Sequence, residues 1–177
     1  MILGRIDQSV LGKVTEERFY VHEVYVDLLN AETGQRGFLL TGSDQYAAPY
    51  VQGQAKFHSD FDSLKKVLGD NPVNKSFISR FDSLSNDKLT ELAETVATRK
   101  QENGFQEAVA IVETNKGNDL MTKIRDLIIT KLGDCNSTIQ TFHNQLGVLS
   151  WIIIVGGSFS ILLELTLILN FFFVRRT

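Results

Sequence analysis

Apolar residues recur every three or four positions through most of the first 148 residues. That spacing places them on one face of a helix, and no stretch keeps the strict alternation of a half-buried strand. Breaks rich in Gly, Asn and Asp separate the apolar series. The pattern therefore predicts an all-α chain whose first four helices span roughly residues 4–41, 44–69, 72–102 and 105–148.

Residues 42–49 predict where the first helix ends and where the second begins. Gly42 supplies the left-handed conformation that commonly ends a helix, and Ser43 or Asp44 can cap the next one. Pro49 follows just beyond the first turn. Because proline removes a backbone donor, we expect either a local kink there or a start delayed to about residue 47.

The third and fourth helices have clear signals as well. Asn71 is a favourable cap, and Pro72 occupies the first helical position, where proline is preferred. Residues 103–104, Asn-Gly, should end the third helix. The run Asn-Lys-Gly-Asn at 115–118 interrupts the fourth helix, and we expect a bulge or short break there.

The lengths and turns of these helices constrain their arrangement. Short turns make sequential helices antiparallel neighbours, so the chain predicts an up-down-up-down four-helix bundle. The first and fourth helices are its two long legs. We expect the core to contain Cys135 of the fourth helix and a stripe of aromatic residues, which comprises Phe57, Phe61, Phe77 and Phe81.

The fourth helix has no stop signal before a long apolar segment. Residues 149–174 contain Glu164 as their one ionisable residue, and 26 helical residues rise about 39 Å, more than the hydrocarbon core of a bilayer. We therefore predict that the fourth helix continues into a transmembrane helix. Trp151 suits an interfacial position, and Arg175 and Arg176 predict a cytoplasmic C-terminus. Residues 1–148 would then be an extracytoplasmic (periplasmic) domain, and 175–177 a short cytoplasmic tail.

Composition excludes several classes of protein. Lys and Arg total 18 against 21 Asp and Glu, a formal net charge of −3, and a general nucleic-acid binder would show a basic excess. One cysteine rules out a disulfide framework or a Cys-rich metal site. The three histidines are widely separated, and no catalytic or phosphate-binding motif occurs. We therefore expect no enzymatic activity in this chain, no metal and no cofactor.

The first residues carry charges every few positions and lack the apolar core of a signal peptide. Two explanations remain open. The chain is a fragment of a longer protein with an upstream membrane span, or a small domain crosses the membrane with its N-terminus leading. The first helix points back toward the bilayer where the sequence begins, which favours the upstream span.

The segment at 28–50, LLNAETGQRGFLLTGSDQYAAPY, resembles the core motif of CHASE3 domains, most specifically in ETGQRGFLLTG at 32–42. Weaker similarity continues at 69–72 and 115–125. CHASE3 domains are extracytoplasmic sensor modules of bacterial histidine kinases, chemoreceptor-like proteins and cyclic-nucleotide enzymes. The resemblance implies a helical bundle between two membrane spans, followed by a signalling output. The sequence departs from that pattern at both ends, since it contains neither the first span nor an output domain.

Within this motif, Glu32 and Arg36 stand four residues apart and can form an ion pair on one helix. The pair is either a structural clasp, tying the first helix to the fourth, or a site where Arg36 meets an anionic ligand. Arg125, in the second similar stretch, is the third candidate. Gly34 and Gly37 lower helix stability, and we expect them to permit close approach of another helix or to leave room for a small molecule.

A second candidate site lies in the apolar segment. Glu164 falls near its middle, where a charge is costly. The carboxyl group is protonated, pairs with another subunit, or forms hydrogen bonds across a dimer face. Gly156 and Ser160 form a small-xxx-small pair, which is typical of close helix contacts, although an ordinary lipid-facing surface has the same appearance.

Two functions from different classes fit these features. The first is the sensory and anchoring module of a transmembrane signalling receptor of the histidine-kinase type. It would act as a homodimer, and a small-molecule ligand or a membrane-protein partner would shift the fourth helix. The alternative is a non-enzymatic, single-span subunit whose bundle docks onto a larger membrane complex.

Overall fold

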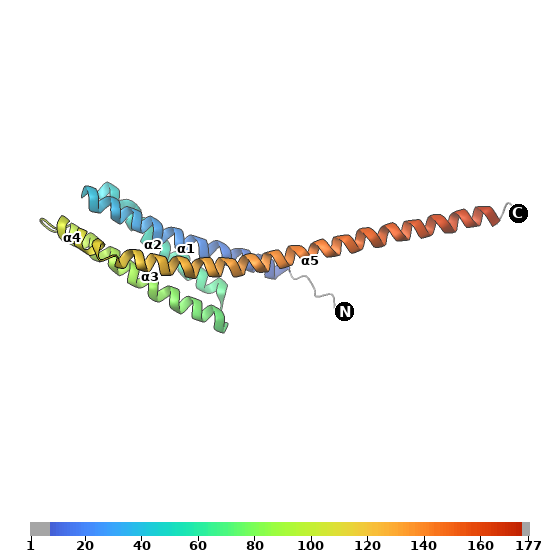
Figure 1. Ribbon diagram of the computed structural model, residues 1–177, viewed down its shortest axis with the longest axis horizontal. Coiled ribbons are helices and arrows are strands. Elements are labelled where there is room, and N and C mark those ends of the chain that lie inside the picture. The colour runs from blue at the N-terminus through green and yellow to red at the C-terminus, as the bar shows by residue number, and fades with distance from the viewer. Residues whose placement is uncertain (1–7, 175–177) are drawn as a thin grey trace.

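The computed structural model describes residues 8–174, with side chains for residues 9–168, and places the described backbone almost entirely in helices (Figure 1). No strand occurs among residues 8–174, so the prediction of an all-α fold is confirmed. The helices are α1 (Gln8–Thr41), α2 (Asp44–Leu68), α3 (Pro72–Arg99), α4 (Phe105–Glu113) and α5 (Lys116–Val174).

The turn between α1 and α2 follows the sequence prediction in part. Gly42 has φ of 68°, and its N–H donates to the Phe38 carbonyl at 2.7 Å, as expected for a left-handed helix end. Ser43 occupies the cap position of α2, but its side chain makes no capping hydrogen bond. Its backbone carbonyl accepts from the Tyr46 N–H at 3.0 Å instead. Capping by the Ser43 or Asp44 side chain is therefore not observed at this turn.

α2 begins at Asp44 and contains Pro49, so the alternative of a start delayed to about residue 47 is wrong. α1 packs closely against this part of α2. A Cβ atom added to Gly34 would clash with the backbone nitrogen of Tyr50 and would lie 2.9 Å from the Pro49 carbonyl carbon. One turn further along, a Cβ on Gly53 would lie 2.6 Å from the Asp27 carbonyl oxygen. Two glycines, one on each helix, thus let the backbones of α1 and α2 pack in direct contact.

The starts of α3 and α5 are local features that the sequence predicts correctly. The Asn71 side chain accepts from the Asn74 N–H at 2.9 Å, with Pro72 in the first turn. The predicted interruption of the fourth helix falls between α4 and α5, where Asn115 has φ of 63°. The third helix ends at Arg99, earlier than the predicted 102, and the chain turns through Asn103 at φ of 62°.

The chain reverses direction after α1, after α2 and after α3, whereas α4 and α5 run the same way, and α5 extends well beyond the other helices (Figure 1). The α1–α2 and α3–α4 turns lie together at the end far from the C-terminus. α1 packs most extensively on α2, and α5 packs on both α1 and α3. The 59 residues of α5 rise about 88 Å without a break. Its second half projects away from the bundle (Figure 1).

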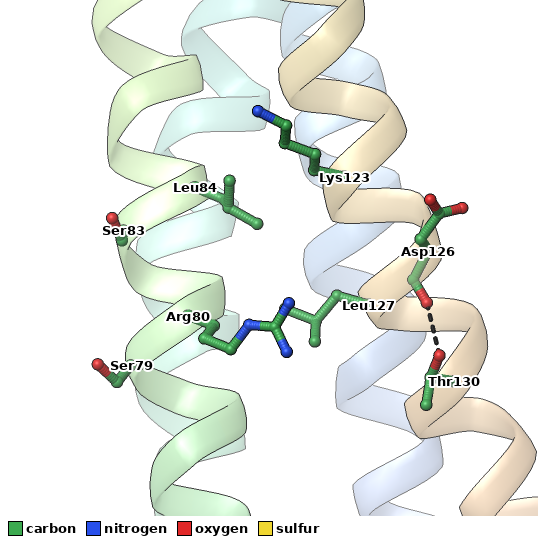
Figure 2. A pocket seen from close by; sticks show the side chains of 8 residues that line it. All are labelled: Ser79, Arg80, Ser83, Leu84, Lys123, Asp126, Leu127 and Thr130. Atoms are coloured by element: carbon green, nitrogen blue, oxygen red, sulfur yellow. Dashed lines mark hydrogen bonds between the residues drawn. The ribbon is translucent and has the colours of Figure 1, made fainter.

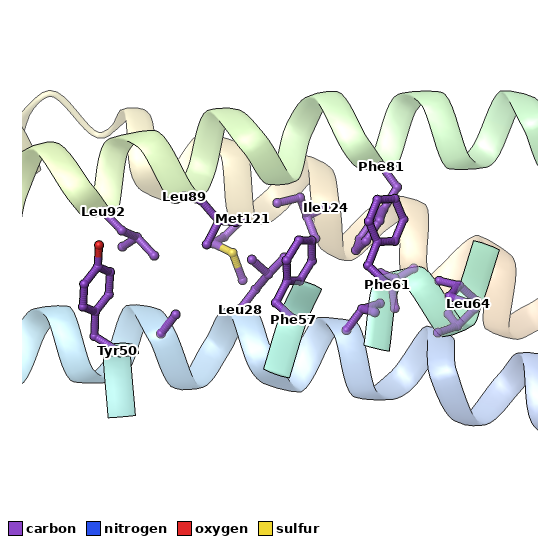
Figure 3. Packing of buried hydrophobic residues seen from close by; sticks show 14 of the residues in the cluster. Leu28, Tyr50, Phe57, Phe61, Leu64, Phe81, Leu89, Leu92, Met121 and Ile124 are labelled. Atoms are coloured by element: carbon purple, nitrogen blue, oxygen red, sulfur yellow. The ribbon is translucent and has the colours of Figure 1, made fainter. Parts of the chain in front are cut away.

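The bundle core contains a group of four phenylalanines, and Tyr50 lies among the aliphatic side chains further along it (Figure 3). The predicted stripe of four phenylalanines is buried, with neighbouring rings 5.4–6.1 Å apart. Phe19 and Leu40 of α1 are exposed, by 55% and 74%. Leu40 follows the buried Leu39, and the rotation of about 100° per residue carries it to the outer face.

The contact at Gly34 predicts that alanine destabilises the fold at this position but not at Gly12 of the same helix. Gly34→Ala must push Pro49 and Tyr50 away from α1, and overpacking of this kind costs about 1–3 kcal/mol. Gly12→Ala on the same helix meets nothing within 4 Å and should stabilise the chain slightly through helix propensity. Thermal unfolding of both variants in detergent micelles, followed by circular dichroism, checks this. Equal melting temperatures would contradict direct backbone packing.

Candidate functional site

Glu32 lies in the last third of α1 and accepts two hydrogen bonds on one oxygen. Arg36 Nη2 donates to Glu32 Oε1 at 3.2 Å, which is the ion pair that the sequence predicts. Lys88 Nζ of α3 donates to the same oxygen at 3.0 Å. The Arg36 side chain is 60% exposed, whereas that of Glu32 is 12% exposed. Glu32 therefore joins a surface arginine to a buried lysine.

Lys88 is the centre of this arrangement. Its side chain is 2% exposed, and its ammonium also donates to Glu91 Oε2 at 2.8 Å. Glu32, Arg36, Lys88 and Glu91, here called the distal charge cluster, balance two carboxylates with two cations. A Cβ on Gly117 would lie 2.8 Å from both Lys88 Nζ and Glu91 Oε2. Glycine at that position thus lets the first turn of α5 cover the cluster.

Arg125 forms no hydrogen bond with the distal charge cluster among the described residues and bonds to Tyr25 instead. Its Nε donates to the Tyr25 hydroxyl at 3.0 Å, and that hydrogen bond raises the pKa of the guanidinium. The expectation that Glu32 and Arg36 tie the first helix to the fourth therefore needs correction. Glu32 is tied to α3 through Lys88, because the buried ammonium faces α1 from that helix. Arg125 and Tyr25 supply the contact between α5 and α1.

A second polar network lies closer to the apolar half of α5, and the sequence analysis did not identify it. Lys131 Nζ pairs with Glu17 Oε1 of α1 and donates to Asn74 Oδ1 of α3 at 3.0 Å. The Cys135 thiol donates to Glu17 at 3.5 Å, and burial raises its pKa to about 12. Glu17, Asn74, Lys131 and Cys135, here called the proximal polar cluster, connect three helices. Cys135 is buried, as predicted.

Asp27 is a buried acid at the contact between α1 and α2. It is 1% exposed, and Lys56 Nζ lies 4.0 Å from Oδ1. Its Oδ2 atom has no hydrogen-bond partner among the residues that the structure describes. Burial raises the pKa of Asp27 from 3.8 to about 6, since the attraction of Lys56 offsets only part of the desolvation and Asp60 and Glu23 add repulsion.

A signal for some of these residues is present in the sequence. Lys88 falls on the apolar face of α3, seven residues after Phe81 and four before Leu92, and both of these are buried. A lysine at such a position must find a partner, because an unpaired buried charge is very costly. The sequence does not say which acid on which helix supplies it.

The three residues of the predicted intramembrane site lie on one face of α5, since Gly156, Ser160 and Glu164 are spaced by four. All three are exposed and distant from the bundle. The described part of α5 contains one stretch long and apolar enough to cross a membrane. Contacts of this face with another subunit remain a prediction.

Comparison with known proteins agrees with the motif at 32–42. Residues 20–134, most of the bundle, match the CHASE3 domain. The chain belongs to the CHASE3 domain family. Its structure is similar to that of the sensor domain of histidine kinase HK9 from Rhodopseudomonas palustris. The two share 26% identity with a TM-score of 0.61, over 74% of this chain and 98% of the HK9 chain. A comparison with curated proteins found no match.

CHASE3 domains are extracytoplasmic sensor domains, so the family gives this chain a sensory role. Within the part of the chain that the structure describes, no three His, Cys, Asp or Glu side chains are grouped to hold a metal ion. His22 is a surface residue whose Nδ1 lies 3.3 Å from Glu23.

The distal charge cluster of the CHASE3 domain predicts a large effect for one substitution. Lys88→Met leaves two carboxylates without their buried cation, and removing one partner of a buried ion pair costs about 3–5 kcal/mol. Arg36→Met is the control, because exposed pairs contribute about 0–1 kcal/mol. Chemical unfolding measures both. Adding Glu91→Leu to Lys88→Met should recover much of the loss, and a loss as small as that of Arg36→Met would contradict a buried pair.

Asp27 predicts a pH-dependent stability. The folded chain keeps its proton up to about pH 6, and the unfolded chain loses it near the ordinary value of 3.8. Ionisation therefore lowers the free energy of unfolding as the pH rises between these values, by up to about 3 kcal/mol. Asp27→Asn should raise the melting temperature at pH 8 and change it little at pH 3.5. A gain of equal size at both pH values would exclude this ionisation as the cause.

Proposed function

We propose that this chain is the sensory and membrane-anchoring module of a transmembrane receptor of the histidine-kinase type. The observation that carries the proposal is the continuity of α5. One helix contributes to the bundle core and then provides the exposed apolar segment. The similarity to the HK9 sensor domain supports the receptor class. Any kinase or other output activity would belong to a part of the receptor outside these 177 residues.

In this proposal, residues 149–174 cross the membrane and residues 1–148 form the extracytoplasmic domain. The side chains of 151–168 are exposed, which suits a lipid environment and would be costly in water. Trp151 is 69% exposed, at the bundle side of the apolar segment. Arg175 and Arg176 follow its other end and place the C-terminus in the cytoplasm.

The proposed transmission passes through α5. The proximal polar cluster fixes α5 to α1 and α3, and Arg125 fixes it to Tyr25 of α1. A rearrangement of α1 or α3 must therefore move α5 or break these contacts, of which those of the proximal polar cluster are buried. A stimulus shifts the bundle between two arrangements only if it binds one of them more tightly. The unbroken backbone hydrogen bonds of α5 would then carry the displacement into the membrane.

We also propose that the receptor acts as a homodimer. The first part of α1 and residues 142–146 in the middle of α5 border a groove of about 970 Å³ with exposed apolar side chains. Phe19 and Leu146 in its wall are 55% and 40% exposed. A second copy would cover this surface, and it would place the face of Gly156, Ser160 and Glu164 against its counterpart within the membrane.

The transmission is tested in a chimera that joins residue 177 to the cytoplasmic half of a histidine kinase. Two bundle sequences, wild type and Lys88→Met, should give different autophosphorylation rates. A flexible Gly-Ser insert between Gly147 and Val148 should abolish that difference. The matched control inserts seven helix-forming residues at the same place, which adds nearly two whole turns and should preserve the difference. A difference that survives the flexible insert would refute transmission by a rigid helix.

A further inference from the structure

A groove of about 580 Å³ lies between α3 and α5 (Figure 2). Its walls come from 79–84 of α3 and 123–130 of α5. The proximal polar cluster joins the same two helices on one side of it, and Gly117 covers Lys88 on the other. The two helices are therefore held together at both ends of the groove and leave an open space between these points.

Two cations from opposite helices line this groove. Arg80 extends from α3 toward Leu127 of α5, and Lys123 of α5 lies about one turn away, beyond Leu84 (Figure 2). Neither Arg80 nor Lys123 forms an ion pair within residues 9–168. Both side chains are exposed to solvent. The groove thus presents two positive charges that the protein itself does not neutralise.

The remaining walls favour an organic anion over a bare inorganic one. Leu84 and Leu127 are half-buried and provide apolar surface near the two cations. Ser79 and Ser83 also border the groove on α3, with their hydroxyl groups pointing away from α5 (Figure 2). Asp126 is the acidic residue among those that line the groove, and its carboxylate points away from α3 (Figure 2). An anion in the groove would therefore meet two cations with no opposing carboxylate between them.

We propose that the α3–α5 groove binds a small dicarboxylate. The planar guanidinium of Arg80 matches one carboxylate with two parallel hydrogen bonds, and the ammonium of Lys123 binds the other. The carbon chain between the two carboxylates would lie against Leu84 and Leu127, which line the groove between the two cations.

The location gives the ligand a direct effect on α5. A dicarboxylate held by Arg80 and Lys123 bridges α3 and α5. It stabilises the arrangement of the two helices in which the separation of these two cations matches that of its two carboxylates. Only this consequence rests on the proposed sensory function. Binding itself is a property of the groove and is measurable without any output domain.

The experiment titrates the full chain in non-ionic detergent micelles by calorimetry, with malonate, succinate, glutarate and adipate as probes. Saturable binding is expected, with one chain length preferred, and the preferred dicarboxylate should bind at least about tenfold more tightly than butyrate. Arg80→Gln and Lys123→Gln should each weaken it about tenfold or more, and after Lys123→Gln it should bind no better than butyrate. Lys66→Gln, an exposed cation on α2 outside the groove, is the matched control and should leave binding unchanged.

Three results would overturn the proposal. Absence of saturable binding removes the site. Butyrate binding as tightly as every dicarboxylate shows that one cation suffices. Inorganic phosphate binding as tightly as the preferred dicarboxylate indicates a general anion site. Equal melting temperatures for the Arg80→Gln variant, the Lys123→Gln variant and the wild type show that a weaker affinity is not caused by unfolding. If binding fails while the chimera with its two inserts behaves as expected, the sensory function stands without this ligand.

Discussion

The bundle depends on the need of the buried Lys88 ammonium for partners. A charge that is 2% exposed must be compensated within a few ångströms, because removing it from water is costly. Glu91, one turn along the same helix, supplies part of the compensation without constraining the tertiary structure. Glu32 supplies the rest from α1, and this contact fixes how far α1 and α3 can slide past one another. Apolar packing alone tolerates such sliding better than a hydrogen-bonded ion pair does.

The same cluster explains two features of the chain that have nothing to do with charge. Gly117 lies where any side chain would collide with Lys88 and Glu91, so the break before α5 is placed where a small residue is needed. Gly34, two residues after Glu32, lets α2 press against the opposite side of α1. The position of α1 in the bundle therefore rests on a charged contact on one of its faces and a backbone contact on another.

Much of the fold could be predicted from local patterns. Gly42, Asn71 and Pro72 act through the backbone of their own turn, so their effects do not depend on the tertiary structure. The site could be predicted only in part. The pair of Glu32 and Arg36 is local, within one helix, whereas the partners of Glu32 on α3 and of Arg125 on α1 depend on which helix faces meet. Asp27 and Glu17 gave no signal, because an acid on a helix surface and an acid at a helix contact look alike in sequence.

The arrangement of contacts along α5 bears on how a bundle of this kind responds to a stimulus. Near its start α5 rests on the distal charge cluster through Gly117, and further along Lys131 pairs with Glu17 of α1. Both contacts are buried and resist small displacements. Between them, α3 and α5 face each other across an open groove, where bringing the helices together breaks no buried pair. The region between the clusters is therefore the part of the α3–α5 contact that should change at the lowest cost in free energy, and under the proposed function a displacement there would reach the apolar segment through the same continuous helix.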